Sequence, residues 1–235
     1  MRQGANASDF SEFLVGFVAR TKSSNEISRL LLKFGPPKIC AVLLKIVQVG
    51  DIVLRQRARE LTREEITSDD TRRLIRTMQD SLRDAPGVGL AAPQIGMSIQ
   101  LAIIEDLPEY GRNLTPEQIA ERERQAIPFH VIVNPKLTGI GDPHVEFFEG
   151  CLSLSGFVAL VPRYHSVRVD CLDENAEPRT IQATGWYARI LQHEIDHLNG
   201  VLYVDRMKSR TFMSVENYSR AWKDLSIDET KVKLG

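Results

Sequence analysis

The clearest hydrophobic pattern in the chain lies between residues 185 and 200, where apolar side chains recur every three to five residues. These positions carry Trp186, Ile190, Leu191, Ile195 and Leu198. The spacing matches one face of an α-helix, and no Gly or Pro interrupts it. Asn199-Gly200 follows, and both residue types accept the positive φ that ends many helices. The sequence therefore predicts a helix that packs against the core and ends near residue 199.

Two other stretches show helical signals. Ser68 or Asp69 can cap a helix that ends before Pro86-Gly87. Its apolar face carries Leu74, Ile75, Met78 and Leu82. The run from Thr115 to Gln118 places a capping threonine before a proline at the first helical position, which predicts a polar helix up to about Gln125.

Strands are predicted where apolar residues alternate with polar ones or form short runs. The expected strands cover residues 43–49, 99–104, 129–133, 145–148, 167–172, 179–183 and 201–204. Cys171 lies on the apolar side of one alternation, so we interpret it as a core residue, and Cys40 as equally inert. Because a run of strands precedes the helix at 185–198, we predict an α+β fold. In this fold we expect antiparallel or mixed sheets to pack around the central helix at 185–198.

The chain divides into three parts. We predict an N-terminal extension over residues 1–38, a main domain over 39–212, and a C-terminal tail of weak periodicity over 213–235. The extension holds two apolar clusters at helical spacing and can serve as a packing element, an organelle-targeting leader or a partner contact. Its acidic residues, Asp9, Glu12 and Glu26, disfavour a transit peptide. Bacterial cytoplasm is therefore the first expectation, with mitochondrion or plastid as the alternative.

Composition restricts the possible functions only broadly. With 235 residues and 43% hydrophobic content, the chain can bury an ordinary core without cross-links. The net charge of -1 indicates no sequence-specific nucleic-acid partner. Three widely spaced cysteines fit a reducing compartment better than a disulfide framework. No apolar run reaches the ~18 residues needed to cross a bilayer.

The chemistry is concentrated in the helix at 185–198. His193 and His197 are one turn apart, so both imidazoles can bind a single metal ion, while Glu194 lies beside that ion without having to bind it. This spacing indicates a hydrolytic metal site. The alternative interpretation is a helix with two partly exposed histidines.

A tetrahedral ion needs a third protein ligand, and the sequence offers two candidates. Cys151 can supply a thiolate, which suits Fe(II), Zn(II) or Ni(II), and Glu216 can supply a carboxylate as in thermolysin-like proteases. No third histidine follows His197, and the residues around Glu216 do not match the protease pattern. Cys151 is therefore preferred. Residues 87–96 form a loop of small residues that either presents Gln94 to a ligand or is only a turn.

Three segments together resemble the sequence motifs of peptide deformylases. They are Gly87–Gln94, Glu149–Ser153 and Gln192–Leu198, and the likeness extends from about Lys45 to about Phe212. Details around Gly185-Trp186 and Ser209–Phe212 resemble the subgroup of organellar and some bacterial enzymes, called type 1A. The resemblance implies hydrolysis of the N-formyl group from the formyl-methionine of new polypeptides.

The resemblance also implies a role for each motif. Cys151, His193 and His197 would hold one ion, expected to be Fe2+, with Zn2+, Ni2+ or Co2+ also acceptable. Glu194 would transfer the proton. The Gln94 side chain and the Leu152 backbone N–H would stabilise the oxyanion.

Substrate contacts and partners follow as hypotheses. Val88, Trp186 and Ile190 would line the methionine pocket, and the backbones of Gly89 and Gly150 would pair with the extended peptide. The expected partners are the N-formyl-methionyl nascent peptide and, transiently, the ribosome, with the protein a monomer or weak dimer. The rival hypotheses are a zincin-like metallopeptidase and a non-catalytic metal-binding paralogue.

Overall fold

Two antiparallel sheets form the frame of the protein in this computed structural model, which describes residues 43–85, 87–112, 114–142 and 145–234. The first has the order β1-β2-β3-β6-β7, and its strands are Gly89–Ala91, Leu101–Asp106, Ile127–Ile140, Ser166–Leu172 and Pro178–Thr184. The second has the order β4-β5-β8, with strands Val145–Cys151, Leu154–Arg163 and Met213–Ser214. All neighbouring strands pair antiparallel, so the predicted α+β class is confirmed. The extension at 1–38 and Cys40 lie outside the described residues.

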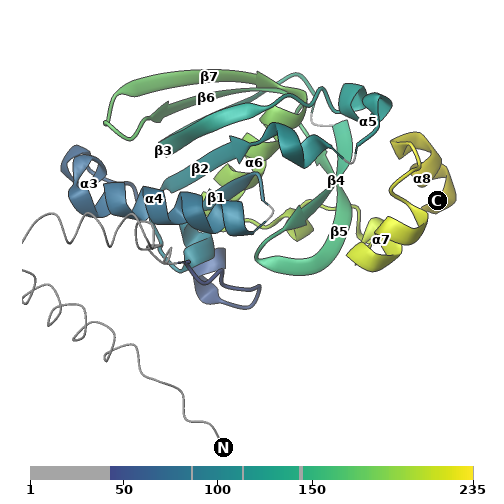
Figure 1. Ribbon diagram of the computed structural model, residues 1–235, viewed down its shortest axis with the longest axis horizontal. Helices are drawn as coiled ribbons and strands as arrows, with labels where there is room; N and C mark the ends of the chain where they lie inside the picture. The colour runs from purple at the N-terminus through teal and green to yellow at the C-terminus, as the bar shows by residue number, and fades with distance from the viewer. Residues whose placement is uncertain (1–42, 86, 113, 143–144, 235) are drawn as a thin grey trace, which may run out of the picture. The chain divides into compact units, whose positions relative to one another are not determined.

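The helix α6, Gly185–Leu198, packs between the five-stranded sheet and the β4–β5 hairpin (Figure 1). Its Ala188, Leu191 and Leu198 are fully buried against sheet residues that include Ala102 and Val169. The helix ends as predicted, with Asn199 as the cap and Gly200 at a φ of 74°. A Cβ on Gly200 would meet the Arg55 carbonyl oxygen at 2.7 Å, so the close approach as well as the φ requires glycine.

The other face of the same sheet is covered by α4, Asp69–Asp84, which begins at the Ser68 cap (Figure 1). Alternate residues of β2 point to opposite faces. Leu101 and Ile103 therefore pack in the core beside α4, while Ala102 and Ile104 pack in the core beside α6. This two-sided burial explains why all six residues of β2 are buried.

Several predicted strand boundaries differ from those in the structure. Residues 43–48 are extended but form no strand, since Val47 N–H donates to Gln94 C=O and joins no ladder. β3 does not stop at Asn134, because residues 136–140 pair with β6 beyond a register shift. At this irregularity the Asn134 side-chain amide makes two hydrogen bonds with the Leu61 backbone. Residues 201–204 form no strand either, and Tyr203–Asp205 is a 3-10 turn.

The remaining helical elements are short. They are η1 Ile52–Arg55, α3 Arg63–Thr67, η2 Ala92–Ile95, η3 Pro108–Gly111, α5 Pro116–Glu121, η5 Ser209–Thr211, α7 Val215–Ala221 and α8 Ile227–Leu234. α5 ends four residues earlier than expected, and Glu123 follows with a φ of 49°. The C-terminal segment contains β8, α7 and α8, and β5, which the hydrophobic pattern did not predict, pairs with β8. No helix among the described residues is long and apolar enough to cross a membrane.

Candidate metal centre and active site

Three side chains from two elements meet in one cluster of potential metal ligands. Cys151 ends β4, and His193 and His197 lie one turn apart on α6. One donor atom from each lies within 4.8 Å of the other two. Cys151 Sγ is 3.2 Å from His197 Nε2. A thiolate and two imidazoles form the kind of soft and borderline donor set that binds Fe(II) or Zn(II).

Glu149 fixes the orientation of the first imidazole. Its Oε2 lies 3.0 Å from His193 Nδ1, which leaves His193 Nε2 as the ring nitrogen available to an ion. A carboxylate behind a metal-bound histidine sets the ring orientation and increases the basicity of the ligand nitrogen. His197 is fixed by packing instead, because it is buried and its Nδ1 has no hydrogen-bond partner among the described residues.

Glu149 is in turn held by two buried arginines. Arg163 donates to both carboxylate oxygens, at 3.0 and 2.9 Å, and Arg189 Nη1 donates to Oε1 at 2.6 Å. Arg163 also pairs with Asp196 of α6, to which Arg206 donates at 2.7 and 2.8 Å. These ion pairs join α6 to β4 and β5, so the helix that carries the histidines is tied to the strand that carries the cysteine.

The electrostatics of the cluster favour a cation. Burial raises the pKa of Glu149, but Arg163 and the other donors outweigh burial and hold it well below its ordinary value. Burial lowers the pKa of His193, yet its contacts with Cys151 and Glu149 raise it well above the ordinary value. For His197, burial and the neighbouring His193 charge lower the pKa. The buried Glu149 carboxylate behind His193 therefore stays ionised, and its negative charge favours a cation at the cluster.

Glu194 is a buried carboxylate beside the ligands. It is 3% exposed, and its Oε2 has no hydrogen-bond partner among the described residues. Burial raises the pKa of Glu194 to about 7. A carboxyl group with a pKa near neutrality is suited to accept and return a proton.

Gln94 approaches the cluster from the opposite side. Its Oε1 accepts a hydrogen bond from Ala91 N–H at 2.8 Å, and its Nε2 lies 3.6 Å from Cys151 Sγ. Gln94 is 1% exposed, so the side chain is held by packing as well. The residues at 87–96 therefore do more than form a turn: β1 and η2 place one amide nitrogen next to the ligands.

A cavity of about 880 Å³ opens onto this cluster. Its lining includes the predicted site residues Val88, Gly89, Gln94, Gly150, Cys151, Leu152, Trp186, Ile190, His193 and Glu194. His197 does not line the cavity and is only 1% exposed. The structure thus brings nearly all of the predicted site residues around one space. Phe157 and Val215, which sequence reasoning did not select, also line it.

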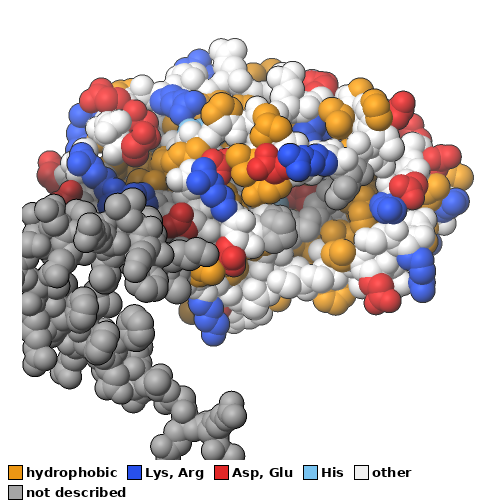
Figure 2. Space-filling model, in the orientation of Figure 1, with side chains coloured by type: hydrophobic (Ala, Val, Ile, Leu, Met, Phe, Trp, Pro, Cys, Tyr) orange, Lys and Arg blue, Asp and Glu red, His pale blue; other side chains and the backbone are white. Residues whose placement is uncertain are grey.

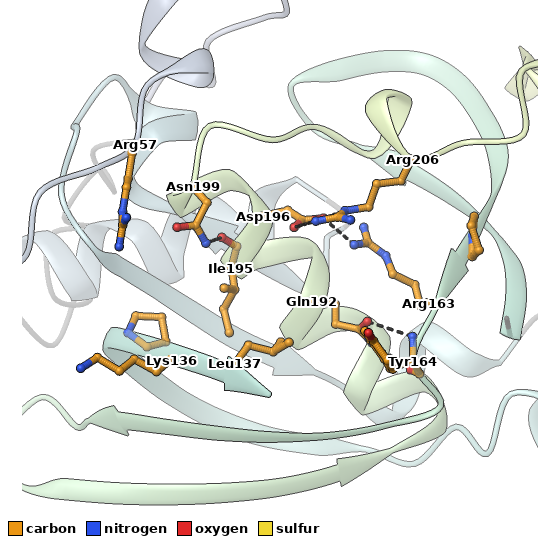
Figure 3. A pocket seen from close by; sticks show the side chains of 12 residues that line it. Arg57, Lys136, Leu137, Arg163, Tyr164, Gln192, Ile195, Asp196, Asn199 and Arg206 are labelled. Atoms are coloured by element: carbon orange, nitrogen blue, oxygen red, sulfur yellow. Dashed lines mark hydrogen bonds and ion pairs between the residues drawn. The ribbon is translucent and has the colours of Figure 1, made fainter. Parts of the chain in front are cut away.

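A second cavity, of about 420 Å³, lies against another face of α6 (Figure 3). Gln192, Ile195 and Asp196 point into it, while Arg163 and Arg206 approach Asp196 from across the space. No residue of the ligand cluster lines this cavity, and its buried charges are already paired with one another. We therefore place the candidate active site in the larger cavity.

The alternative third ligand is not at the site. Glu216 is exposed on α7 and does not belong to the ligand cluster of the described residues. On the face shown in Figure 2, basic and acidic side chains are interspersed with hydrophobic ones, which agrees with the net charge of -1.

Sequence reasoning left Glu149, Arg163, Arg189 and Asp196 without a role. Glu149 and Asp196 lie inside the quoted motifs, so their position next to metal ligands was an available signal. Arg189 lies in Ala188–Ile190, a stretch that also resembles the type 1A subgroup, but Arg163 lies in none of these segments. For both arginines, the sequence distance from Glu149 conceals the contact.

The comparisons with known proteins agree with this geometry. The sequence model described as "Polypeptide deformylase" matches residues 43–213. The chain is 46% identical over 172 residues to "Peptide deformylase 1A, chloroplastic" of Solanum lycopersicum, covering 73% of this chain and 62% of that protein. It is 44% identical to "Peptide deformylase 1A, chloroplastic/mitochondrial" of Arabidopsis thaliana, covering 92% and 79%. A Met-Ala-Ser-bound class I type b peptide deformylase from Acinetobacter baumannii superimposes with a TM-score of 0.63 at 30% identity, covering 71% and 99%.

Proposed function

Because the chain belongs to the polypeptide deformylase family of metal-dependent hydrolases, we propose that it removes the N-formyl group from the N-terminal formyl-methionine of newly synthesised polypeptides, releasing formate. The observation that carries this proposal is the meeting of Cys151, His193 and His197 beside the unpaired Glu194 carboxylate in one cavity. Hydrolysis of a formamide needs an activated water, a stabilised oxyanion and a proton for the departing amine. The cavity contains a group for each requirement.

Glu194 is assigned the proton transfers. When bound by Cys151, His193 and His197, the metal ion supplies Lewis acidity toward water and the formyl oxygen. Glu194 accepts the proton of the attacking water and later donates it to the amine nitrogen as the C–N bond breaks. Such general acid–base catalysis typically contributes 10²- to 10⁴-fold.

Gln94 and Leu152 are assigned the oxyanion. The Gln94 Nε2 group lies next to the ligand cluster, and the Leu152 backbone N–H follows directly after Cys151. Preorganised donors of this kind stabilise the charge that develops on the formyl oxygen, and each commonly contributes about 2.7–4 kcal/mol.

The extended substrate fits between two strand edges. β1 is an edge of the five-stranded sheet and β4 is an edge of the three-stranded sheet, and Gly89 and Gly150 of these strands both line the cavity. Their backbone groups are assigned to pair with the peptide by β-addition. Val88, Trp186 and Ile190 are assigned to the methionine side chain, and all three line the same cavity.

The proposed native ion is Fe2+, with Zn2+, Ni2+ and Co2+ as ions that the same ligands accept. We assign catalysis to residues 39–212 and treat 1–38 and 213–235 as additions to the catalytic domain. The protein acts as a monomer or weak dimer that meets the ribosome transiently. Its compartment is the bacterial cytoplasm, or a plastid or mitochondrion if residues 1–38 direct it there, as the name of the Arabidopsis relative suggests for that protein.

One assay tests the proposed activity. The full chain, loaded anaerobically with Fe2+ or with Ni2+, is incubated with formyl-Met-Ala-Ser and separately with an internally quenched peptide. Formate release without internal cleavage is expected. Internal cleavage supports a metallopeptidase, and metal binding without either product supports a non-catalytic paralogue.

A further inference from the structure

A three-residue brace, Val47-Gln48-Val49, holds both loops that carry the proposed oxyanion donors. The brace belongs to neither sheet, and its last residue, Val49, enters the turn that Asp51 N–H closes onto Gln48 C=O. Val47 N–H donates to Gln94 C=O at 2.9 Å, and Val49 N–H donates to Ser153 C=O at 2.7 Å. One short segment thus bonds to two loops that are far apart in the sequence and sets their separation.

The Gln48 side chain adds a second connection to the turn between β4 and β5. Its Nε2 donates to Leu152 C=O at 2.9 Å, and its Oε1 accepts from Ser155 N–H at 3.4 Å. Only this orientation of the amide satisfies both partners. If the amide were rotated by about 180°, its oxygen would face the Leu152 carbonyl oxygen and its NH₂ group would face the Ser155 N–H. The carboxamide therefore closes the turn from its outer side.

The peptide group held by Gln48 also contacts the metal-ligand sulfur. The carbonyl of the Leu152–Ser153 peptide accepts from Gln48, and the N–H of the same peptide lies 3.4 Å from Cys151 Sγ. Because a peptide group is planar, an interaction that fixes its oxygen also fixes the direction of its N–H. Gln48 thereby determines how this N–H meets the sulfur, and it restrains the chain next to the Leu152 N–H.

We propose that Gln48 is a positioning residue for the reaction, acting through the Leu152–Ser153 peptide on the oxyanion donor and on the Cys151 sulfur. This inference rests on the proposed deformylase function. Gln48 is exposed and lies outside the cavity lining, so it does not touch the substrate. Its effect is on the geometry of the loop rather than on binding or on the core.

The test compares Gln48→Ala and Gln48→Glu with wild type in the Ni2+-loaded full chain. Gln48→Glu keeps the length and the acceptor for Ser155 N–H but replaces the donor that faces Leu152 C=O. We expect kcat to fall about tenfold in both, less than the 10²–10³ of losing an oxyanion donor outright, with KM within about twofold. Lys45→Ala, at an exposed position in the same segment, is the matched control and should keep wild-type kcat.

A second readout follows the sulfur itself. In Co2+-loaded protein, the thiolate-to-cobalt absorption band should shift in both Gln48 variants and stay at the wild-type position in Lys45→Ala, while the unfolding temperature of all variants stays near that of wild type. Wild-type kcat with an unchanged cobalt spectrum overturns the inference. A loss of kcat accompanied by a lowered unfolding temperature also overturns the inference. Absence of formate release by wild type refutes the proposed function instead, and the cobalt spectra then still test the positioning role.

Discussion

Gly89 of β1 lies so close to Glu194 of α6 that a Cβ atom on Gly89 would meet Glu194 Oε1 at 2.4 Å. The backbone of an edge strand therefore forms one wall around the proposed proton acceptor, and only glycine leaves the carboxylate in its place. Glycine is required at position 89 because of this close approach. A turn is not the reason, since β1 is extended and paired with β2.

Gly89→Ala should accordingly lower kcat by about 10²-fold, because the added methyl group must displace the Glu194 carboxylate by roughly 1 Å. The measurement is steady-state formate release together with metal content, which should not change. Gly111→Ala is the control, since a Cβ there would meet nothing within 4 Å. Equal activity of Gly89→Ala and wild type would show that Glu194 needs no such fit.

Glu194→Ala should retain the ion but lose more than about nine-tenths of formate release, since the proton acceptor is removed while Cys151, His193 and His197 remain. Metal content by elemental analysis and kcat on formyl-Met-Ala-Ser provide the two measurements. A variant that keeps more than about a tenth of the activity would contradict the role assigned to Glu194.

The third ligand can be tested by paired substitutions. Cys151→Ser should lose most metal affinity, because a hydroxyl replaces the thiolate at the ligand cluster. Glu216→Gln should bind metal like wild type, because Glu216 is exposed on α7. The two affinities are compared by competition with a chelator, and the opposite ranking would assign the site to a different ligand set.

Glu149→Gln should weaken metal binding by about 10- to 100-fold, since it removes the carboxylate behind His193. It should also destabilise the fold by roughly 3–5 kcal/mol, because Arg163 and Arg189 are left as buried charges without their shared partner. Denaturant unfolding and chelator competition measure the two effects.

The control for Glu149→Gln is Glu146→Gln on the same strand. Glu146 pairs with Lys208 and Lys231, whose side chains are about half exposed. This variant should change stability only slightly and leave metal affinity unaltered. A loss of metal affinity in both variants would mean that β4 as a whole, and not Glu149, orients the histidine.

A pH-dependent contribution to stability is expected from Glu105 on β2. Arg83 donates to both of its carboxylate oxygens at 2.7 Å, and these hydrogen bonds lower the pKa of Glu105 below its ordinary value. A folded-state pKa below the unfolded one stabilises the protein above the unfolded pKa, and that stabilisation is lost as the pH falls through the folded pKa. Glu105→Gln should therefore cost about 1 kcal/mol at pH 7, a value reduced for the exposure of Arg83.

The cost of Glu105→Gln should begin to shrink as the pH falls below the unfolded-state pKa of about 4.3, and it should vanish as the pH falls through the lower folded-state pKa. Urea unfolding at several pH values provides the measurement. A cost that stays constant from pH 7 to pH 3 would contradict the assignment.

The sequence by itself determined the elements whose signals are local. The helical spacing in α6 placed His193 and His197 on one face, Ser68 marked the start of α4, and the alternation around Val169 predicted β6 with Cys171 in the core. Such signals depend on neighbours within one or two turns of helix or along one strand, so they can be read without knowing the fold.

Only the tertiary structure decided what each element bonds to. Residues 43–49 have the composition of a strand, but the N–H groups of Val47 and Val49 donate to the carbonyls of Gln94 and Ser153 and join no ladder. β3 continues past Asn134 because residues 136–140 find a partner in β6, and Leu61, far away in the sequence, satisfies the Asn134 amide at the irregularity. Likewise, nothing near Glu149 in the sequence shows that Arg163 and Arg189 neutralise it. The physical reason is the same in each case: a buried polar group must be paired, and the chain topology determines which partner is within reach.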